Sequence, residues 1–272
     1  MKIVRALAIF VVVAIASVVR ADPAPRPNVL IIVSDDMGWN GIGFHRGFTK
    51  TANLDRIAGQ GVELDRFYVC PMCSPTRAGL MTGRYALHVG MGRTVVHPWS
   101  YDGGLPPDET TIATALAPAG YKTRAIFGKW HLGHMDPKWL PLTHGFTQFR
   151  GCYTGAIDYY THERLGEVDW HDNYANSDER GYVTDLIADD TAAFIKAHAQ
   201  DRQPFFCYTA FTAPHAPLEA PKKYVDRYAH LDDNPKDGKP SNKQLMAALV
   251  AALDDGVGRI LDSIERAGVA ER

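Results

Sequence analysis

Two short apolar runs constrain the fold of this 272-residue chain more than any other feature. Residues 28–33 (NVLIIV) and 204–211 (PFFCYTAF) are almost continuously apolar. Such runs are typical of strands buried on both faces, as in the sheets of α/β proteins. A further strand is predicted over residues 120–127. We therefore expect an α/β fold with a central sheet.

Apolar residues at helical spacing predict the elements that flank this sheet. The longest helix is expected to be capped by Ser241 or Asn242 and to run through residue 267. A strand over residues 61–69 is expected to lead into the most distinctive motif of the chain. The other expected helices cover residues 51–59, 110–117, 182–199 and 222–228.

Polar side chains follow both apolar runs. Asp35 and Asp36 come directly after the first run, and His215, between two prolines, follows the second. Ligand sites in open α/β sheets form at the carboxyl ends of the strands, so we expect these side chains at one edge. Paired carboxylates favour Ca²⁺ or Mg²⁺. The alternative is a solvated turn, with the aspartates as caps and the histidine as a turn residue.

The most distinctive motif covers residues 69–85 (VCPMCSPTRAGLMTGRY). Ser74 is expected to cap a helix that has Pro75 at its first position. Cys73 would then lie just before the helix N-terminus, with the cation Arg77 about one turn further on. Such a place binds anions and activates a thiol. The alternative is a buried structural cysteine.

Lys129 and His131 alternate within residues 128–133 (GKWHLG). On an extended segment both side chains face the same way. A lysine and a histidine that converge on one pocket suit an anionic substrate and proton transfer. The alternative is an exposed lysine and a capping histidine.

Three of these motifs resemble the type I sulfatases. Cys73-x-Pro75-x-Arg77 followed by AGLMTGR resembles the sulfatase signature, and GKWHLG resembles the second one. The stretch VSDDMGWN at residues 33–40 resembles the start of such proteins, and residues 146–160 resemble the arylsulfatase B-like (N-acetylgalactosamine-4-sulfatase-like) branch. The resemblance covers residues 27–272 and implies an alkaline-phosphatase-like sulfatase fold, a mixed sheet flanked by helices.

The resemblance implies a cofactor, a modification and a substrate class. Cys73 is oxidised to formylglycine by a formylglycine-generating enzyme, and the aldehyde hydrate is the nucleophile. Asp35, Asp36 and residue 73 are ligands of Ca²⁺. The substrate is a sulfated sugar or an aryl sulfate.

The same resemblance assigns a role to each remaining site residue. Lys129 neutralises the sulfate together with Ca²⁺, and Arg77 holds the hydrate. His215 assists the leaving alcohol, and His131 takes the remaining hydroxyl proton. In one departure from the family pattern, residues 123–128 are one residue longer than usual, so we expect a bulge or a shifted turn there.

Sulfatases of this type continue with a strand that ends in an Asp-Asn pair, a later lysine and a smaller C-terminal domain. Residues 27–272 are therefore expected to be the N-terminal portion of a catalytic domain, with the C-terminal part missing. If that part is missing, we expect the Ca²⁺ site to have too few ligands and the sheet to have an unpaired edge. A truncated, non-catalytic sulfatase-like protein is the alternative. A phosphoester hydrolase is disfavoured, because the sister families use Thr or Ser nucleophiles and usually paired transition metals.

The composition narrows the partners and the compartment. The net charge is −2 and no basic run occurs, so nothing favours nucleic-acid binding. Two basic residues precede an apolar stretch at 6–19, and this layout predicts a secretory signal over residues 1–21. We expect export to the medium, periplasm or lysosome, with no stable membrane partner; a retained anchor is the alternative. Cys70, Cys152 and Cys207 leave at least one free thiol.

Overall fold

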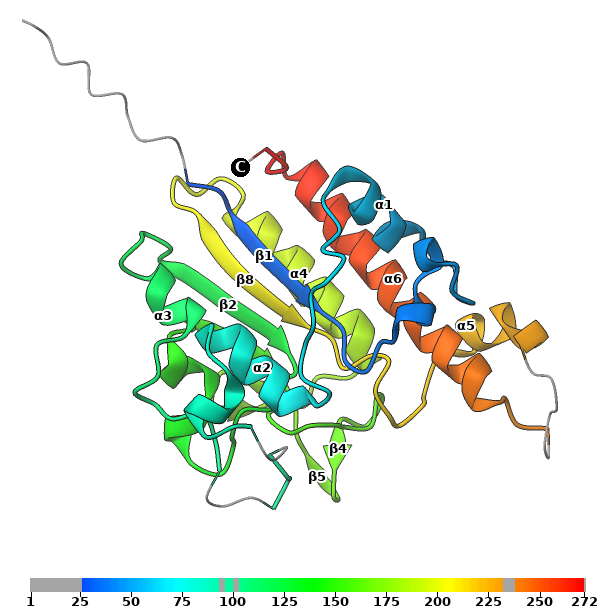
Figure 1. Cartoon of the computed structure of the whole chain (residues 1–272), viewed down its shortest axis with the longest axis horizontal. Coiled ribbons are helices and arrows are strands. Elements are labelled where there is room, and N and C mark those ends of the chain that lie inside the picture. The colour runs from blue at the N-terminus through cyan, green and yellow to red at the C-terminus, as the bar shows by residue number, and fades with distance from the viewer. Residues whose placement is uncertain (1–25, 93–95, 100–102, 232–237, 272) are drawn as a thin grey trace, which may run out of the picture.

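A six-stranded mixed sheet forms the centre of the computed structural model, which describes residues 26–92, 96–99, 103–231 and 238–271. Its order is β1-β8-β2-β3-β6-β7, and helices lie on both of its faces (Figure 1). The first four strands of this order are parallel and the last two pair antiparallel, which confirms the predicted fold. The strands are β1 (Val29–Val33), β2 (Thr123–Gly128), β3 (Gln148–Gly151), β6 (His171–Asp172), β7 (Ala175–Asn176), β8 (Phe205–Ala210) and the separate pair β4 (Glu163–Arg164) and β5 (Glu167–Val168).

The predicted helices are confirmed, each within a few residues of its expected bounds. Ser241 caps the longest of them through its side chain. The α-helices are α1 (Ala52–Gln60), α2 (Cys73–Thr82), α3 (Ile112–Leu116), α4 (Val183–His198), α5 (Lys222–Arg227) and α6 (Asn242–Arg266). Short 3₁₀ turns are η1 (Trp39–Gly41), η2 (Gly43–His45), η3 (Ala86–Val89), η4 (Pro137–Trp139), η5 (Pro141–His144) and η6 (Ala229–Leu231).

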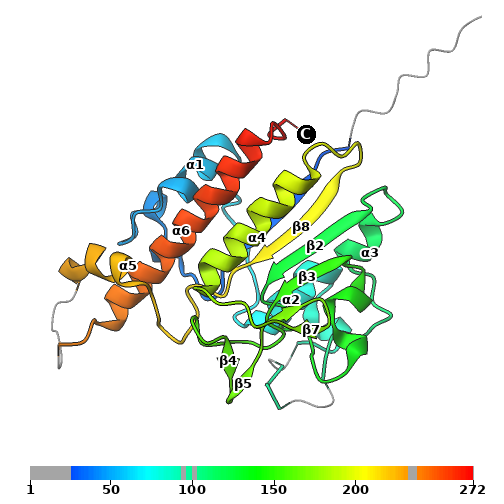
Figure 2. The same cartoon turned by 180° about the vertical axis from the view of Figure 1, so that it is seen from behind.

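Strand β8 supplies side chains to two hydrophobic cores, one on each face of the sheet. Phe205 and Cys207 belong to the core beneath α4 and α6, and Phe206 and Tyr208 belong to the core beneath α2 and α3. All six residues of β8 are buried. This alternation follows from the two-residue period of a strand, and it makes β8 the centre of the packing. Figure 2 shows α4 against the sheet with α6 beside it.

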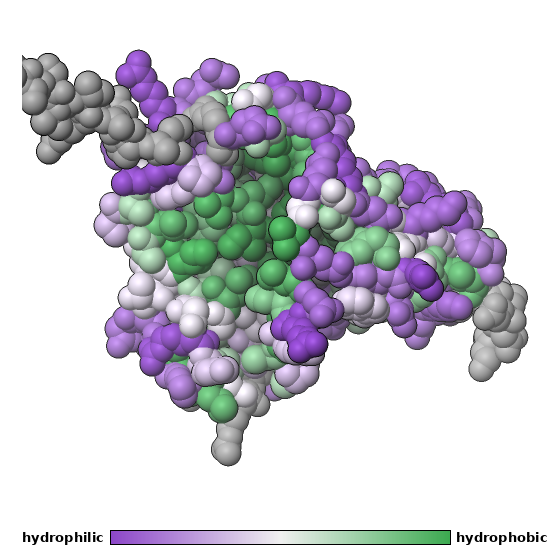
Figure 3. All heavy atoms as spheres, turned by 45° about the horizontal axis from the view of Figure 1, so that its top comes forward, coloured by the Kyte–Doolittle hydropathy of each residue, from purple (hydrophilic) through white to green (hydrophobic). Residues whose placement is uncertain are grey.

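Strand β1 differs from the expectation of burial on both faces. All five of its residues are half-buried, because β1 lies at the edge of the sheet and pairs only with β8 among the described strands. Figure 3 shows hydrophobic residues gathered in a hollow in the middle of one face, rimmed by hydrophilic ones. The predicted unpaired edge is therefore present in the part of the chain that the structure describes.

One other local prediction is wrong, and of the bulge or shifted turn expected at residues 123–128 the bulge is absent. Residues 61–69 form no strand: they cross from α1 to α2 with exposed side chains, since no described strand lies beside them to pair with (Figure 1). β2 contains no bulge, because its register with β8 runs without interruption from Thr123↔Phe205 to Gly128↔Ala210. The turn comes only at Gly128, whose φ is +101° and where a Cβ would lie 2.1 Å from the Ala210 carbonyl oxygen.

The predicted secretory signal lies outside the described residues. Among the helices that the structure does describe, none is both long and apolar enough to cross a membrane.

Asp254, in the middle of α6, caps a different helix. Its buried carboxylate accepts the backbone N–H groups of Asn53 and Leu54 at 3.2 and 2.9 Å, where α1 begins without a side-chain cap of its own. We predict that Asp254→Ala lowers the free energy of unfolding by about 1–3 kcal/mol, because buried N–H groups lose their acceptor. Urea denaturation measures this. Asp262→Ala, which removes only an exposed pair with Arg266, should change it by less than about 0.5 kcal/mol; equal effects would contradict the capping role.

Candidate active site

The carboxyl ends of three parallel strands meet at one edge of the sheet, as predicted. β1 ends before Asp35, whose N–H donates to the Ala213 carbonyl at 3.0 Å. β2 ends before Lys129, whose N–H donates to the Ala210 carbonyl at 2.8 Å. These backbone bonds place Asp35, Lys129 and the segment after β8 side by side.

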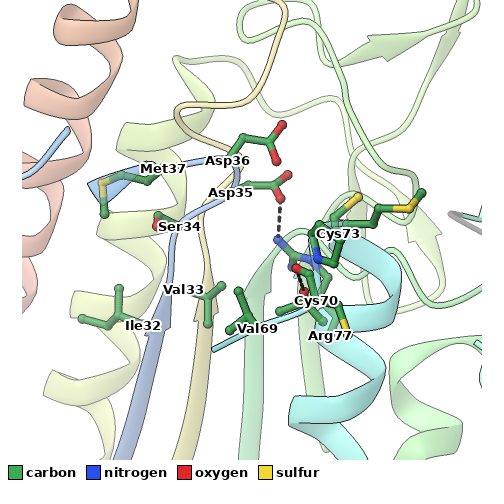
Figure 4. A pocket seen from close by; sticks show the side chains of 14 residues that line it. Ile32, Val33, Ser34, Asp35, Asp36, Met37, Val69, Cys70, Cys73 and Arg77 are labelled. Carbon is green, nitrogen blue, oxygen red and sulfur yellow. Dashed lines mark hydrogen bonds and ion pairs between the residues drawn. The ribbon is translucent and has the colours of Figure 1, made fainter. Parts of the chain in front are cut away.

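A buried cluster of three charges joins this edge to helix α2. Lys129 Nζ donates to Asp35 Oδ2, and an Arg77 guanidinium nitrogen lies 3.6 Å from Asp35 Oδ1 (Figure 4). Arg77 Nη1 also donates to the Lys129 carbonyl at 2.6 Å. The three residues are 0–4% exposed. Burial and the charge of Arg77 lower the pKa of Lys129, and Asp35 opposes this shift. Two cations against one carboxylate leave the cluster with excess positive charge.

Helix α2 begins at Cys73 itself, two residues earlier than predicted. Met72 is the extended N-cap residue. Ser74 is not the cap: its hydroxyl accepts the N–H of Val96 at 3.1 Å and thereby ties the helix to a neighbouring loop. Cys73 is half-buried, and its thiol lies within electrostatic range of Arg77 and Lys129. The predicted placement of a thiol at a helix N-terminus beside a cation is confirmed.

A cavity of about 610 Å³ opens onto this cluster. Asp35, Asp36, Cys73 and Arg77 are among the residues that line it, and Figure 4 shows Asp35 pointing toward Arg77 across it. Four of the seven predicted site residues therefore share one cavity wall. Lys129 is buried beneath Asp35.

His131 reaches the site by a backbone conformation that the sequence did not predict. The segment is not extended here, since His131 has a left-handed φ of +58°. Its Nε2 lies 2.9 Å from the Val96 carbonyl, and a Cβ on Gly155 would lie 2.4 Å from its ring. Burial, with the charges of Lys129 and Arg77, holds the pKa of His131 well below its ordinary value. The neutral ring donates from Nε2, so the buried Nδ1 keeps a free lone pair.

His215 and Asp36 form the more exposed side of the site. His215 Nδ1 donates to the Ala216 carbonyl at 2.6 Å, and its Nε2 lies 3.6 Å from Asp36 Oδ2. Asp36 has a left-handed φ of +63°, and its side chain is 61% exposed. The peptide bonds before Pro214 and Pro217 are both cis. The predicted meeting of His215 with the aspartates is confirmed for Asp36.

Sequence reasoning missed two residues that support the site. Tyr208 of β8 is buried, with its hydroxyl 3.4 Å from Arg77 Nη1. A tyrosine inside a buried strand needs a partner for its hydroxyl, and this was an available signal. Asp169 is buried and accepts the N–H groups of Tyr153 and Thr154 at 2.9 and 2.8 Å, next to the carbonyl that binds the N–H of His131. Nothing local in the sequence marks Asp169.

The aspartates alone do not make a metal site. Within the described ranges, no group of three or more His, Cys, Asp or Glu side chains is arranged to hold a metal ion. Ca²⁺ takes about 6–8 oxygen ligands, whereas here Asp35 is paired with two cations. All four cysteines are free thiols.

An α/β sheet with two buried cations, two histidines and a cysteine at its carboxyl edge is suited to the hydrolysis of an anionic ester. The chain belongs to the sulfatase family, whose model matches residues 27–272.

Individual relatives agree with this membership. The chain is 32% identical to arylsulfatase J of Mus musculus over 251 residues, covering 89% of this chain and 40% of that protein. It is 33% identical to human N-acetylgalactosamine-6-sulfatase over 274 residues, covering 92% and 49%. The chain thus spans about half the length of the curated relatives it matches.

Solved structures share the fold. The crystal structure of Ps i-CgsB matches with a TM-score of 0.80 at 28% identity, covering 89% of this chain and 56% of that one. The PsFucS1 sulfatase from Pseudoalteromonas sp. matches with a TM-score of 0.69 at 23% identity, covering 89% and 52%.

Buried neutral histidines make the stability of this fold depend on pH. Burial lowers the pKa of His144 from 6.5 to about 4, and both of its ring nitrogens lack a partner among the described residues. Between these two pKa values the unfolded chain binds a proton at His144 that the folded chain does not bind. The stabilisation that depends on the neutral ring is therefore full above pH 6.5 and is lost as the pH falls toward 4. His144→Phe keeps the contact with Trp130 but has no titrating ring. We predict that its free energy of unfolding falls by about 3 kcal/mol less than that of the unmodified chain between pH 6.5 and pH 4. Urea denaturation at several pH values measures it.

The control is the exposed His88→Gln, for which the pH dependence should stay that of the unmodified chain. An unchanged slope in His144→Phe would contradict the buried neutral state.

Proposed function

We propose that this chain contributes the nucleophile and the sulfate-binding cations of a sulfuric ester hydrolase. The observation that carries the proposal is the buried pair of cations, Arg77 and Lys129, next to Cys73 on an open cavity. A sulfate monoester carries one negative charge, and the cluster has one positive charge in excess of its carboxylate.

We propose further that Cys73 is the precursor of formylglycine. The fit rests on three features of the residue: it is half-buried, it lines the cavity, and it is the first residue of a ten-residue helix. The aldehyde hydrate would supply a hydroxyl nucleophile that a thiol does not. A formylglycine-generating enzyme is the partner that this step requires.

Arg77 and Lys129 would bind and orient the ester. Arg77 Nη2 is buried without a hydrogen-bond partner among the described residues, so it has donors left for a sulfate oxygen. Lys129 is held in place by Asp35. Cations fixed in place by the surrounding structure stabilise developing negative charge without reorganisation.

The two histidines have distinct proton roles in this proposal. His131 is neutral and has its Nδ1 lone pair free, so it can accept a proton. His215 lies at the exposed side of the site with Nε2 3.6 Å from Asp36 Oδ2, and we assign it the transfer of a proton to the leaving oxygen. In this proposal the base, His131, is buried, and the acid, His215, lies beside a carboxylate.

We propose that Asp35 and Asp36 supply part of a Ca²⁺ site. Asp35 and Asp36 are the carboxylates that line the cavity among the described residues. Because they fall short of the coordination that Ca²⁺ needs, further ligands must come from elsewhere, and no step above depends on the ion.

The proposed substrate class is a sulfated carbohydrate or an aryl sulfate. It is supported by the similarity to N-acetylgalactosamine-6-sulfatase and to Ps i-CgsB, which has also been solved in complex with k-i-k-neocarrahexaose. An arylsulfatase B-like branch remains our proposal from residues 146–160. We also propose that residues 1–21 direct the export of the chain.

The test measures hydrolysis of an aryl sulfate and of an aryl phosphate by the chain, which is coexpressed with a formylglycine-generating enzyme. We predict hydrolysis of the sulfate ester, and we predict that Cys73→Ala lowers kcat by more than about 10³-fold with an unchanged circular dichroism spectrum, since the nucleophile is lost.

The control is Cys207→Ala, which removes a buried thiol from the opposite core and should keep the activity. Full activity in Cys73→Ala would contradict the proposal. Preference for the phosphate ester would favour a phosphoester hydrolase. A folded, coexpressed chain with no activity toward either ester would favour the non-catalytic alternative.

A further inference from the structure

The segment that carries His215 has few backbone hydrogen bonds of its own. It follows β8 and reads Pro-His-Ala-Pro at residues 214–217, and neither proline has an N–H group to donate. The N–H of His215 donates to the Thr212 carbonyl at 2.9 Å, which is a bond within the same turn. The position of His215 in the site therefore depends on contacts that other parts of the chain supply.

Tyr159, which lies between β3 and β4 in the sequence, supplies such a contact. Its hydroxyl donates to the His215 carbonyl at 2.9 Å. Among the described residues, this is the hydrogen bond that reaches the His215 backbone from outside its own turn. Tyr159 is 1% exposed. A hydroxyl shielded from water in this way keeps its acceptor, because leaving the buried group unpaired would cost its desolvation.

Tyr159 is itself held by three contacts. Its N–H donates to Glu219 Oε2 at 2.9 Å, and its carbonyl accepts the N–H of Val183, the first residue of α4, at 3.0 Å. Its ring stacks on that of Tyr182, with 5.5 Å between the ring centroids. The Tyr159 hydroxyl is therefore fixed relative to helix α4, and the His215 carbonyl is fixed with it.

The imidazole of His215 takes its direction from its own backbone. Its Nδ1 donates to the carbonyl of the next residue, Ala216, at 2.6 Å, so the ring is bound to the segment that carries it. The side chain is 25% exposed, and its Nε2 lies 3.6 Å from the Asp36 carboxylate, beyond a direct hydrogen bond. A displacement of the His215 backbone would therefore move Nε2 with it.

We propose that Tyr159 is a positioning residue for His215. Its hydroxyl fixes the His215 carbonyl and thereby the Nε2 whose proton passes to the ester oxygen as the S–O bond breaks, so that the alcohol leaves uncharged. Tyr159 is buried and is not one of the residues that line the cavity, so it acts through His215. The effect on catalysis rests on the proposed function, whereas the hold of Tyr159 on His215 does not.

The first test varies the alcohol that leaves, in the full chain coexpressed with a formylglycine-generating enzyme. 4-Nitrophenol leaves readily as an anion, whereas phenol leaves poorly without a proton. We expect Tyr159→Phe to lower kcat/KM for phenyl sulfate by about 10- to 100-fold, because a misplaced proton donor loses much of its effect. For 4-nitrophenyl sulfate the loss should stay below about 3-fold, since this alcohol needs little protonation.

Two further variants separate positioning from a general loss of stability. In a His215→Ala background, Tyr159→Phe should lower kcat/KM for phenyl sulfate by no more than about 2-fold, because the group it positions is gone. The matched control is Tyr121→Phe, which removes a buried hydroxyl bonded to the Pro27 carbonyl at 2.8 Å, before the amino ends of β2 and β1; its leaving-group dependence should stay that of the unmodified chain. Equal losses for both esters in Tyr159→Phe, or its full loss in the His215→Ala background, would overturn the proposal.

The second test observes the His215 ring without any need for activity, by NMR of the chain labelled with ¹⁵N in its histidines. The His215 signals are those that His215→Ala removes. We expect Tyr159→Phe to shift them and Tyr121→Phe to leave them in place. Unshifted His215 signals in Tyr159→Phe would overturn the positioning role, whether or not the esters are hydrolysed. Shifted signals in a chain that hydrolyses neither sulfate would support the hold of Tyr159 on His215 and contradict the proposed function.

Discussion

The buried ion pair between Asp35 and Lys129 is the interaction on which the rest of the site depends. It connects the ends of β1 and β2 across β8, and Arg77 brings α2 to the same carboxylate. Charges that are 0–4% exposed carry a desolvation cost that only close partners offset. The three elements are therefore fixed relative to one another by the residues that also face the cavity.

This arrangement couples stability to chemistry. Removing one partner of a buried ion pair costs about 3–5 kcal/mol, since the other charge is left buried and unpaired. Arg77 and Lys129 share the single carboxylate of Asp35, so one positive charge is not neutralised within the cluster, and an anion from solution can neutralise it. An anion-binding site thus follows from the charge imbalance of the cluster, and Cys73 lies beside it because Arg77 and Cys73 are one helical turn apart.

Much of this could be predicted from the sequence. The apolar runs identified β1 and β8, and the polar residues that follow them identified the edge where Asp35, Asp36 and His215 lie. Features set by distant partners could not be predicted. Ser74 binds Val96 instead of capping its helix, and His131 is held in a left-handed conformation by the loop at residues 153–155. Residues 61–69 pair with none of the described strands. Each depends on a contact that local pattern does not encode.

The most direct test of the central claim is a double-mutant cycle of Asp35→Asn and Lys129→Met, measured by urea denaturation with Arg77 intact. If one buried cluster holds β1, β2 and α2 together, each single variant destabilises the fold by several kcal/mol, and the double variant is more stable than the sum of the two losses requires. We expect a coupling free energy of at least about 1.5 kcal/mol. Losses that add to within about 0.5 kcal/mol would show that the two charges act independently and would contradict the account.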